Sequence, residues 1–190
     1  KIAYRAGVGD YSSRAGNMVR YDTPRMAGFS AGVSYGVDEN AAQKRDLVAY
    51  NLRYRAGALD VGLAFQQQKH EATPASDREY VALPAANKLA MLSLSGGYQR
   101  SKDGAGTEDD EYTIGVLVPM GQFELSAGYA WSDADFAGGG SAEGSAFAVG
   151  GAYKLSKRTR LYAAVMDGEI ETAGAATLDR RLFSVGVRHD

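Results

Sequence analysis

The sequence predicts an all-β protein, specifically a transmembrane antiparallel β-barrel. Segments of about ten residues alternate apolar with small or polar side chains, and successive side chains of a strand point to opposite faces. Short and long links alternate between the segments. Because nearly every segment has one apolar and one polar face, lipid on one side and water on the other would suit both.

The composition agrees with this prediction. The 190 residues include 24 Gly and only 4 Pro, which suits closely packed strands and tight turns. The 12 Tyr outnumber 6 Phe and 1 Trp, and amphipathic aromatic side chains favour membrane–water boundaries. The absence of Cys excludes disulfides and thiolate metal sites. A formal net charge of −2 argues against a nucleic-acid binder.

The expected strands can be read in order from their alternation. In the first half they cover residues 17–22, 28–35, 46–55 and 59–66. In the second half they cover residues 111–118, 122–131, 146–155, 160–166 and 181–189. The strand at 122–131 shows the pattern most clearly, because five apolar side chains share one face: Phe123, Leu125, Ala127, Tyr129 and Trp131.

Short turns and long links alternate between these strands. The short turns include residues 23–26, 56–58, 120–122 and 156–159. The long links cover residues 36–45, 67–87, 101–110, 132–145 and 167–180. Short turns on one rim and long loops on the other are typical of bacterial outer-membrane barrels. A soluble β-sandwich is the alternative, but it has no reason to sort its loops in this way.

The segment Lys88–Gln99 breaks the alternation. Between the long links 67–87 and 101–110 the alternation requires two spanning strands, one to the short-turn rim and one back. Only the twelve residues 88–99 are available for them. Two spanning strands need about 9–11 residues each plus a turn. We therefore predict that residues are missing near Met91–Ser95, and that this segment supplies the tenth strand. The opening residues Lys1–Gly9 resemble a fragment of one further strand.

The polar face carries charged side chains that would line the lumen of a barrel. If the apolar residues face lipid, alternation turns eight charged residues inward: Arg20, Asp22, Arg53, Arg55, Asp60, Glu124, Lys154 and Arg188. Five are basic and three are acidic, which suggests a mild preference for anions. The alternative is that Arg20 with Asp22, and Arg55 with Asp60, neutralise each other at one rim.

Aromatic residues lie near both ends of the expected strands. Trp131 and Tyr35 are at the long-loop ends, and Tyr21, Tyr54 and Tyr153 are near the short turns. These positions fit aromatic girdles at the two membrane boundaries. The alternative is the ordinary preference of Tyr for strands.

No segment predicts catalysis or a cofactor. The acidic run Glu108–Glu111 would suit a divalent cation through its hard oxygen ligands, but a solvated loop is the more common explanation. Asp133 and Asp135 carry the same ambiguity. The two histidines, His70 and His189, are far apart in the sequence. The residues Gly138–Gly140 lack the Lys and the strand–helix setting of a phosphate loop.

Several of these segments match a known family in order. The matching pieces are Asn17–Pro24, Ala27–Gly36, Tyr112–Pro119, Tyr153–Thr159, Leu161–Ala164 and Phe183–His189. They resemble the Gram-negative general porins of the beta-proteobacterial type. The resemblance implies a sixteen-stranded barrel, of which about ten strands are represented, beginning after the loop that constricts the pore. We therefore expect residues 1–190 to form a single porin-type domain covering the C-terminal part of the family pattern, with gaps.

The resemblance also implies a function and partners. It implies a passive diffusion channel for small ions and hydrophilic solutes in the bacterial outer membrane, not an enzyme. Outer-membrane lipid and lipopolysaccharide would surround a homotrimer, and neither nucleic acid nor a cofactor is expected. A non-conducting structural or adhesion barrel is the main alternative, because narrow barrels fill with side chains. A soluble all-β binding protein is the third hypothesis.

Overall fold

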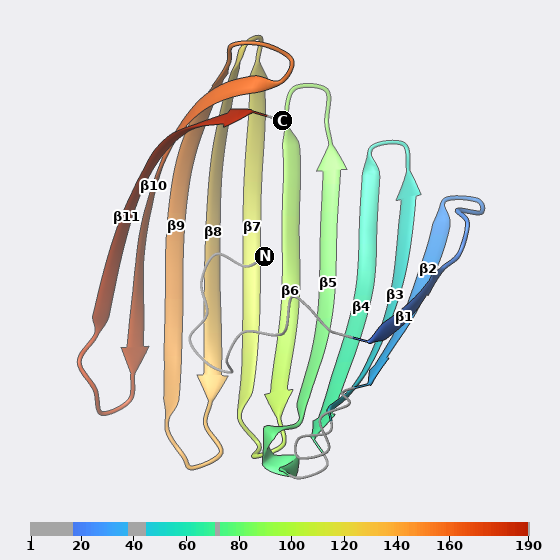
Figure 1. The fold of residues 1–190 in the computed structure, drawn as a ribbon. Coiled ribbons are helices and arrows are strands. Elements are labelled where there is room, and N and C mark those ends of the chain that lie inside the picture. Colours follow the sequence, from blue (N-terminus) through green and yellow to red (C-terminus); the bar gives the residue numbers. More distant parts are fainter. Residues whose placement is uncertain (1–16, 38–44, 71–72, 190) are drawn as a thin grey trace.

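The computed structural model describes residues 17–37, 45–70 and 73–189. Within these residues, eleven β-strands form one antiparallel sheet in which spatial order follows chain order (Figure 1). The strands are β1 (Met18–Asp22), β2 (Phe29–Val37), β3 (Arg45–Ala56), β4 (Leu59–His70), β5 (Arg78–Lys88), β6 (Ser93–Asp103), β7 (Glu108–Met120), β8 (Phe123–Asp135), β9 (Ser141–Lys154), β10 (Thr159–Thr172) and β11 (Leu178–His189).

The sheet is an up-and-down meander. Each strand pairs antiparallel with the next, and within the described residues no pairing joins β1 to β11. The sheet is curved, with the edge strands β1 and β11 nearer to the viewer than the central strands (Figure 1). One 3-10 turn, η1 (Pro74–Ser76), precedes β5. The described residues contain no helix with the length and apolarity that crossing a membrane requires.

The turns at one rim are short, as predicted. Two of them depend on glycine, because Gly57 and Gly121 adopt φ values of 54° and 63°, which are costly for residues with a Cβ. The links at the other rim are shorter than predicted. Residues 104–107 and 136–140 join strands that we expected to be ten or more residues apart. Polar residues predicted as loops instead extend the strands at that rim.

The prediction of missing residues near Met91–Ser95 is wrong. β5 ends at Lys88, β6 begins at Ser93, and the backbone N–H of Leu89 donates to the carbonyl of Leu92 at 2.8 Å to close the turn between them. The meander is therefore continuous, and the described residues form eleven strands instead of ten. The polar start of β5 and its Pro84 concealed this strand in the sequence. The expected fragment Lys1–Gly9 lies outside the described residues.

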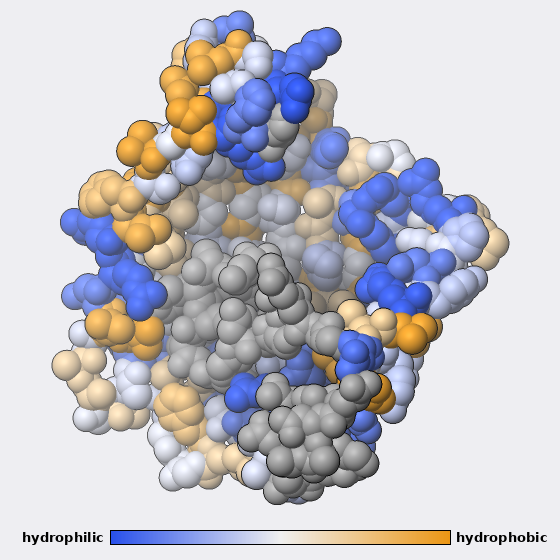
Figure 2. All heavy atoms as spheres, in the orientation of Figure 1, coloured by the Kyte–Doolittle hydropathy of each residue, from blue (hydrophilic) through white to orange (hydrophobic). Residues whose placement is uncertain are grey.

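The two faces of the sheet differ as the alternation predicts. Among the described residues, the buried ones other than glycine all lie on one face: Ser34, Gln68, Tyr80, Gln99, Ser101, Asp109, Glu111, Ala130, Ser132, Ala134, Ala142 and Ala146. We call this the inner face, since side chains on the concave side of a curved sheet crowd one another. The opposite, outer face is apolar and exposed; even in the central strands, Ile114 and Leu125 expose 58% and 49% of their surface. Figure 2 shows hydrophobic residues at the outline where Figure 1 places β9–β11.

Aromatic side chains form two bands on the outer face. Near the long-loop rim, the Tyr112 ring lies 5.0 Å from Trp131 and 5.1 Å from Tyr98. Near the short turns, Phe123 and Tyr153 lie 4.7 Å apart, and Phe29 lies 4.5 Å from Tyr54. Phe123 and Trp131 place the two bands apart along β8, and two separated aromatic bands are the arrangement expected of membrane girdles.

The close approach of β9 and β10 depends on Gly168. A Cβ at this position would lie 2.9 Å from the Ser145 carbonyl oxygen and 3.0 Å from the Ala146 Cβ. We expect Gly168→Val to lower the free energy of unfolding by about 1–3 kcal/mol, because strands must separate to admit the side chain. Urea unfolding followed by the fluorescence of the single Trp checks this. Gly151→Val is the matched control, since its Cβ would meet Leu125 at an ordinary 3.5 Å; equal losses in both variants would contradict the prediction.

Candidate functional site: the charged inner wall

The eight charged residues predicted to face inward all lie on the inner face. Each is within three residues of a strand end at the short-turn rim: Arg20, Asp22, Arg53, Arg55, Asp60, Glu124, Lys154 and Arg188. The strand registers keep them on one side, because partners in adjacent strands share a face. Arg55 is opposite Asp60, Lys154 is opposite Arg160, and Arg160 is opposite Arg188. The result is a band of charge across one end of the sheet.

Arg20 and Asp22 form a same-strand ion pair. The Arg20 Nε donates to Asp22 Oδ2 at 2.7 Å, and its Nη2 donates to Oδ1 at 2.6 Å. Both side chains remain about half exposed, at 49% and 56%. Here the neutralisation that the sequence left open does occur, so this pair adds no net charge to the inner face.

Two guanidinium groups share the carboxylate of Asp60. Arg53 binds it through two nitrogens, with its Nε 2.6 Å from Oδ1, and the Arg55 Nη2 lies 3.0 Å from Oδ2. The turn at 57–58 brings these residues together, because it reverses the chain between Arg55 and Asp60. The cluster therefore keeps one uncompensated positive charge.

Glu124 holds a second cluster of the same kind. Its carboxylate lies 2.7 Å from Lys154 Nζ and 3.8 Å from Arg160 Nη1. Arg160 is absent from the predicted inward-facing residues. The same alternation does place it on the inner face, since the neighbouring Leu161 is apolar and faces outward. Again two cations face one anion, so the formal charge of these three groups is positive by one.

Lys88 is the second inner-face cation that the sequence did not indicate. It lies on the inner face at the short-turn end of β5, which was not recognised as a strand. Within the described part of the chain, no ion pair involves Lys88. With Lys88 and Arg160 added, the band holds seven basic and three acidic side chains among the described residues. We call these ten residues the inner charge band; its formal charge is positive by four.

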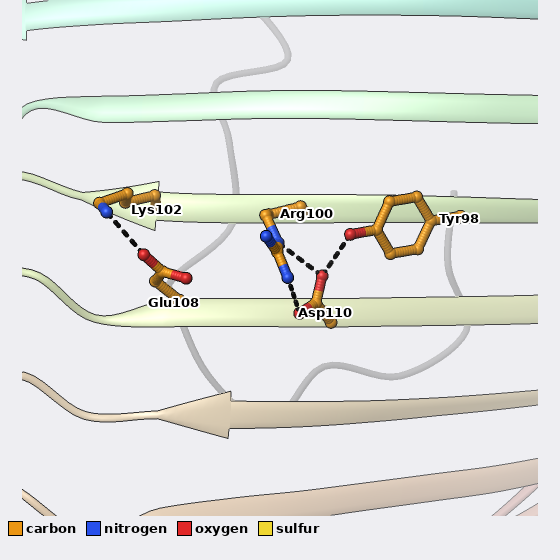
Figure 3. A network of polar contacts seen from close by, with 5 residues as sticks. All are labelled: Tyr98, Arg100, Lys102, Glu108 and Asp110. Atoms are coloured by element: carbon orange, nitrogen blue, oxygen red, sulfur yellow. Dashed lines mark hydrogen bonds and ion pairs between the residues drawn. The ribbon is translucent and has the colours of Figure 1, made fainter.

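The predicted acidic loop Glu108–Glu111 is the start of β7, and the strand divides its charges between the two faces. Glu108 and Asp110 lie on the outer face by their register with β8. Lys102 Nζ meets Glu108 there at 2.6 Å (Figure 3). Arg100 and the Tyr98 hydroxyl both donate to Asp110 (Figure 3), at 2.6–2.8 Å and 2.5 Å. Asp109 and Glu111 point inward and are fully buried. The loop prediction is therefore wrong, and the run does not form one acidic cluster.

The metal site that this run suggested is not formed. Among the described residues, no three His, Asp or Glu side chains gather in a way that would hold a metal ion. On the inner face, the Gln99 Nε2 donates to Glu111 at 2.9 Å. Asp133 and Asp135 project from the outer face of β8, opposite Asp110 and Glu108.

A family model described as Gram-negative porin matches residues 2–173 of this sequence. The chain belongs to the Gram-negative porin family. Two curated porins are similar to it. Outer membrane porin protein 32 of Delftia acidovorans is 30% identical over 167 residues, which is 82% of this chain and 47% of that protein. An outer membrane porin protein of Bordetella pertussis is 26% identical, covering 79% of this chain and 51% of that porin. The chain spans about half the length of these relatives.

Solved porins share the fold. An anion-selective porin from Comamonas acidovorans superimposes with a TM-score of 0.77 at 26% identity, covering 92% of this chain and 59% of that porin. The trimer form of OmpT from Vibrio cholerae gives 0.75 at 17% identity, covering 97% and 75%. These matches confirm the predicted resemblance and the β-barrel fold class.

Proposed function

We propose that this porin is a passive diffusion channel in which the inner face meets water and the outer face meets lipid. The observation that carries the proposal is the inverted burial of the sheet: charged and small side chains occupy the concave face, and large apolar side chains are exposed on the other. In a membrane this arrangement satisfies both faces. The family is Gram-negative, and both curated relatives are named outer membrane porins, so the location is the bacterial outer membrane.

The inner charge band is the proposed determinant of ion preference. Rings of charged side chains set selectivity in pores because they change the local concentration of each ion. The excess of four positive charges in the inner charge band favours anions. The Arg20–Asp22 pair contributes no net charge, but Asp60 and Glu124 each face two cations. The similarity to an anion-selective porin supports this proposal.

Assembly and surroundings follow from the same family membership. We propose that residues 1–190 belong to one domain, since a single meander without crossovers runs through all the described strands. A homotrimer is the proposed assembly, supported by the fold shared with a porin solved as a trimer. Outer-membrane phospholipid and lipopolysaccharide are the proposed partners of the outer face. Porins are channels, not enzymes, and we propose neither a reaction nor a cofactor.

Planar-bilayer recording of the full-length protein tests the proposal. We expect stepwise conductance, and in a KCl gradient a reversal potential displaced toward the equilibrium potential of chloride. Insertion without any conductance would favour the non-conducting structural barrel. A reversal potential displaced toward potassium would contradict the role of the inner charge band while leaving the channel itself in place.

A further inference from the structure

A hollow of about 660 Å³ lies on the inner face between β3 and β7, next to the inner charge band. Twelve of its sixteen lining residues are inner-face positions, and the other four lie between them along the same strands. Its volume is in the range of sites that hold small molecules. The hollow is open toward the concave side, so a ligand there would rest on the wall instead of being enclosed.

The ring of Pro84 forms the floor of the hollow, and the residues beside it have no side chains. Gly62 and Gly97 are its neighbours on β4 and β6. A Cβ on Gly62 would lie 3.3 Å from the Pro84 Cγ, and one on Gly97 would lie 4.0 Å from the Pro84 Cα. Because both positions are glycine, Pro84 is exposed although it is in a central strand. Ala64, Ala82 and Ala86 continue this flat apolar surface.

Pro84 also explains why the hollow forms at this point. Proline has no N–H to donate, and it is rare in the interior of a sheet. The ladder between β4 and β5 pairs Val61 with Ala85 and then Ala64 with Ala82, so the two positions between them are not paired. The strands are continuous on either side. The interruption is therefore local, and the proline ring projects onto the inner face beside Gly62.

One edge of the hollow is positively charged. Arg53 and Asp60 line it, and Arg55 binds the same carboxylate. Lys88 lies two residues beyond Ala86 on the same face of β5 and is exposed. Three cations around one anion leave two positive charges at this edge. The opposite edge carries the uncharged polar side chains of Gln99 and Thr113.

We propose that this hollow binds planar organic monocarboxylates, with the flat apolar body on Pro84 and the carboxylate toward Lys88 and the arginines. An aromatic ring suits the floor because it is flat and apolar, and its removal from water on one side favours binding. The carboxylate suits the edge because guanidinium and ammonium groups attract it and hydrogen-bond to it. The assignment deepens the proposed function by naming a solute class for the same wall, although binding itself does not require conduction.

The probe for the test is 4-fluorobenzoate, titrated into the full-length protein in detergent micelles and followed by its fluorine NMR line. We expect saturable broadening with a dissociation constant on the order of millimolar, because only one side of the ring is covered. The benzoate should bind about fivefold more weakly in Lys88→Gln, which removes one charge interaction in water. Uncharged 4-fluorobenzamide should bind more weakly still, because it loses the attraction to all the cations at this edge. Acetate, which lacks the ring, should not displace the benzoate.

Two variants test whether the benzoate binds in the hollow and not elsewhere on the inner face. Ala86→Leu fills the floor and Pro84→Ala removes its ring, so both should abolish saturable broadening. Ala148→Leu adds the same bulk on the inner face of β9, outside the hollow, and should bind as the parent protein does. The inference would be overturned if the parent protein and these three variants bound the benzoate equally, or if acetate displaced it. Conductance of the same preparations distinguishes the two failures: a conducting channel without benzoate binding refutes only this inference, and a non-conducting protein refutes the proposed channel.

Discussion

The double variant Arg53→Glu with Arg55→Glu should lose the anion preference of the channel. Both side chains bind Asp60, so the change replaces a cluster of two cations and one anion by three anions. The inner charge band falls from four positive charges to neutral, and locally the sign is reversed. Because nearby charges multiply or divide local ion concentrations in water, we expect the ratio of anion to cation permeability to fall by about threefold or more. The reversal potential in a KCl gradient measures this ratio directly.

The matched control changes the net charge equally on the other face. Lys69→Glu with Lys102→Glu also removes two cations and adds two anions, but both residues are on the outer face near the long-loop rim. This variant should keep the reversal potential of the parent protein. If it shifted the potential as far as the Arg53 and Arg55 variant does, total charge and not the inner charge band would control selectivity. The effect should also shrink at high salt, because screening shortens the reach of each charge.

The faces of the strands were predictable because alternation is a local property of the sequence. From Phe123 to Ser132 in β8, apolar residues alternate with small or polar ones, and the structure keeps that division. The same rule put all eight predicted charges on one face, and the strand registers of the structure place them on one face of the sheet. It also applies to Arg160, the first residue of the expected strand 160–166, because its neighbour Leu161 is apolar and lies on the outer face.

The ends of the strands were not predictable by the same rule. Near the long-loop rim both faces of β6 and β7 are polar, because strands that extend beyond the aromatic bands no longer meet lipid. Glu108 and Asp110 therefore resemble a loop in the sequence, although their backbone is in the ladder and their side chains pair with Lys102 and Arg100. Alternation therefore marks only the part of a strand that separates lipid from water.

β5 shows how one residue can conceal an element. Pro84 normally argues against a central strand, and the polar residues before it removed the remaining signal. The hollow could not be foreseen for the same reason. It depends on Gly62 and Gly97 flanking Pro84 on two neighbouring strands, and that proximity is set by the register between strands. The shared use of Asp60 by Arg53 and Arg55 is likewise a product of register and turn geometry.

Val149→Arg should destabilise the membrane-inserted fold by about 2–4 kcal/mol, whereas Ala148→Arg in the same strand should be tolerated. Val149 lies on the outer face of β9, midway between the aromatic bands, opposite Ala127 and Val165. An arginine there would face hydrocarbon, which costs about 2–4 kcal/mol near the middle of the membrane. Ala148 points to the inner face, opposite Gly128 and Met166, so an arginine there would reach water.

These two variants differ by a single step along one strand, so they isolate the division of faces on which the channel depends. Folding into lipid vesicles, measured as the free energy of unfolding in urea, should show the full loss in Val149→Arg and less than about 1 kcal/mol in Ala148→Arg. The reverse order would mean that the apolar face packs against protein and the small-residue face meets lipid. In that case the inner charge band would not border a water-filled lumen, and the conductance predicted for it would have no physical basis.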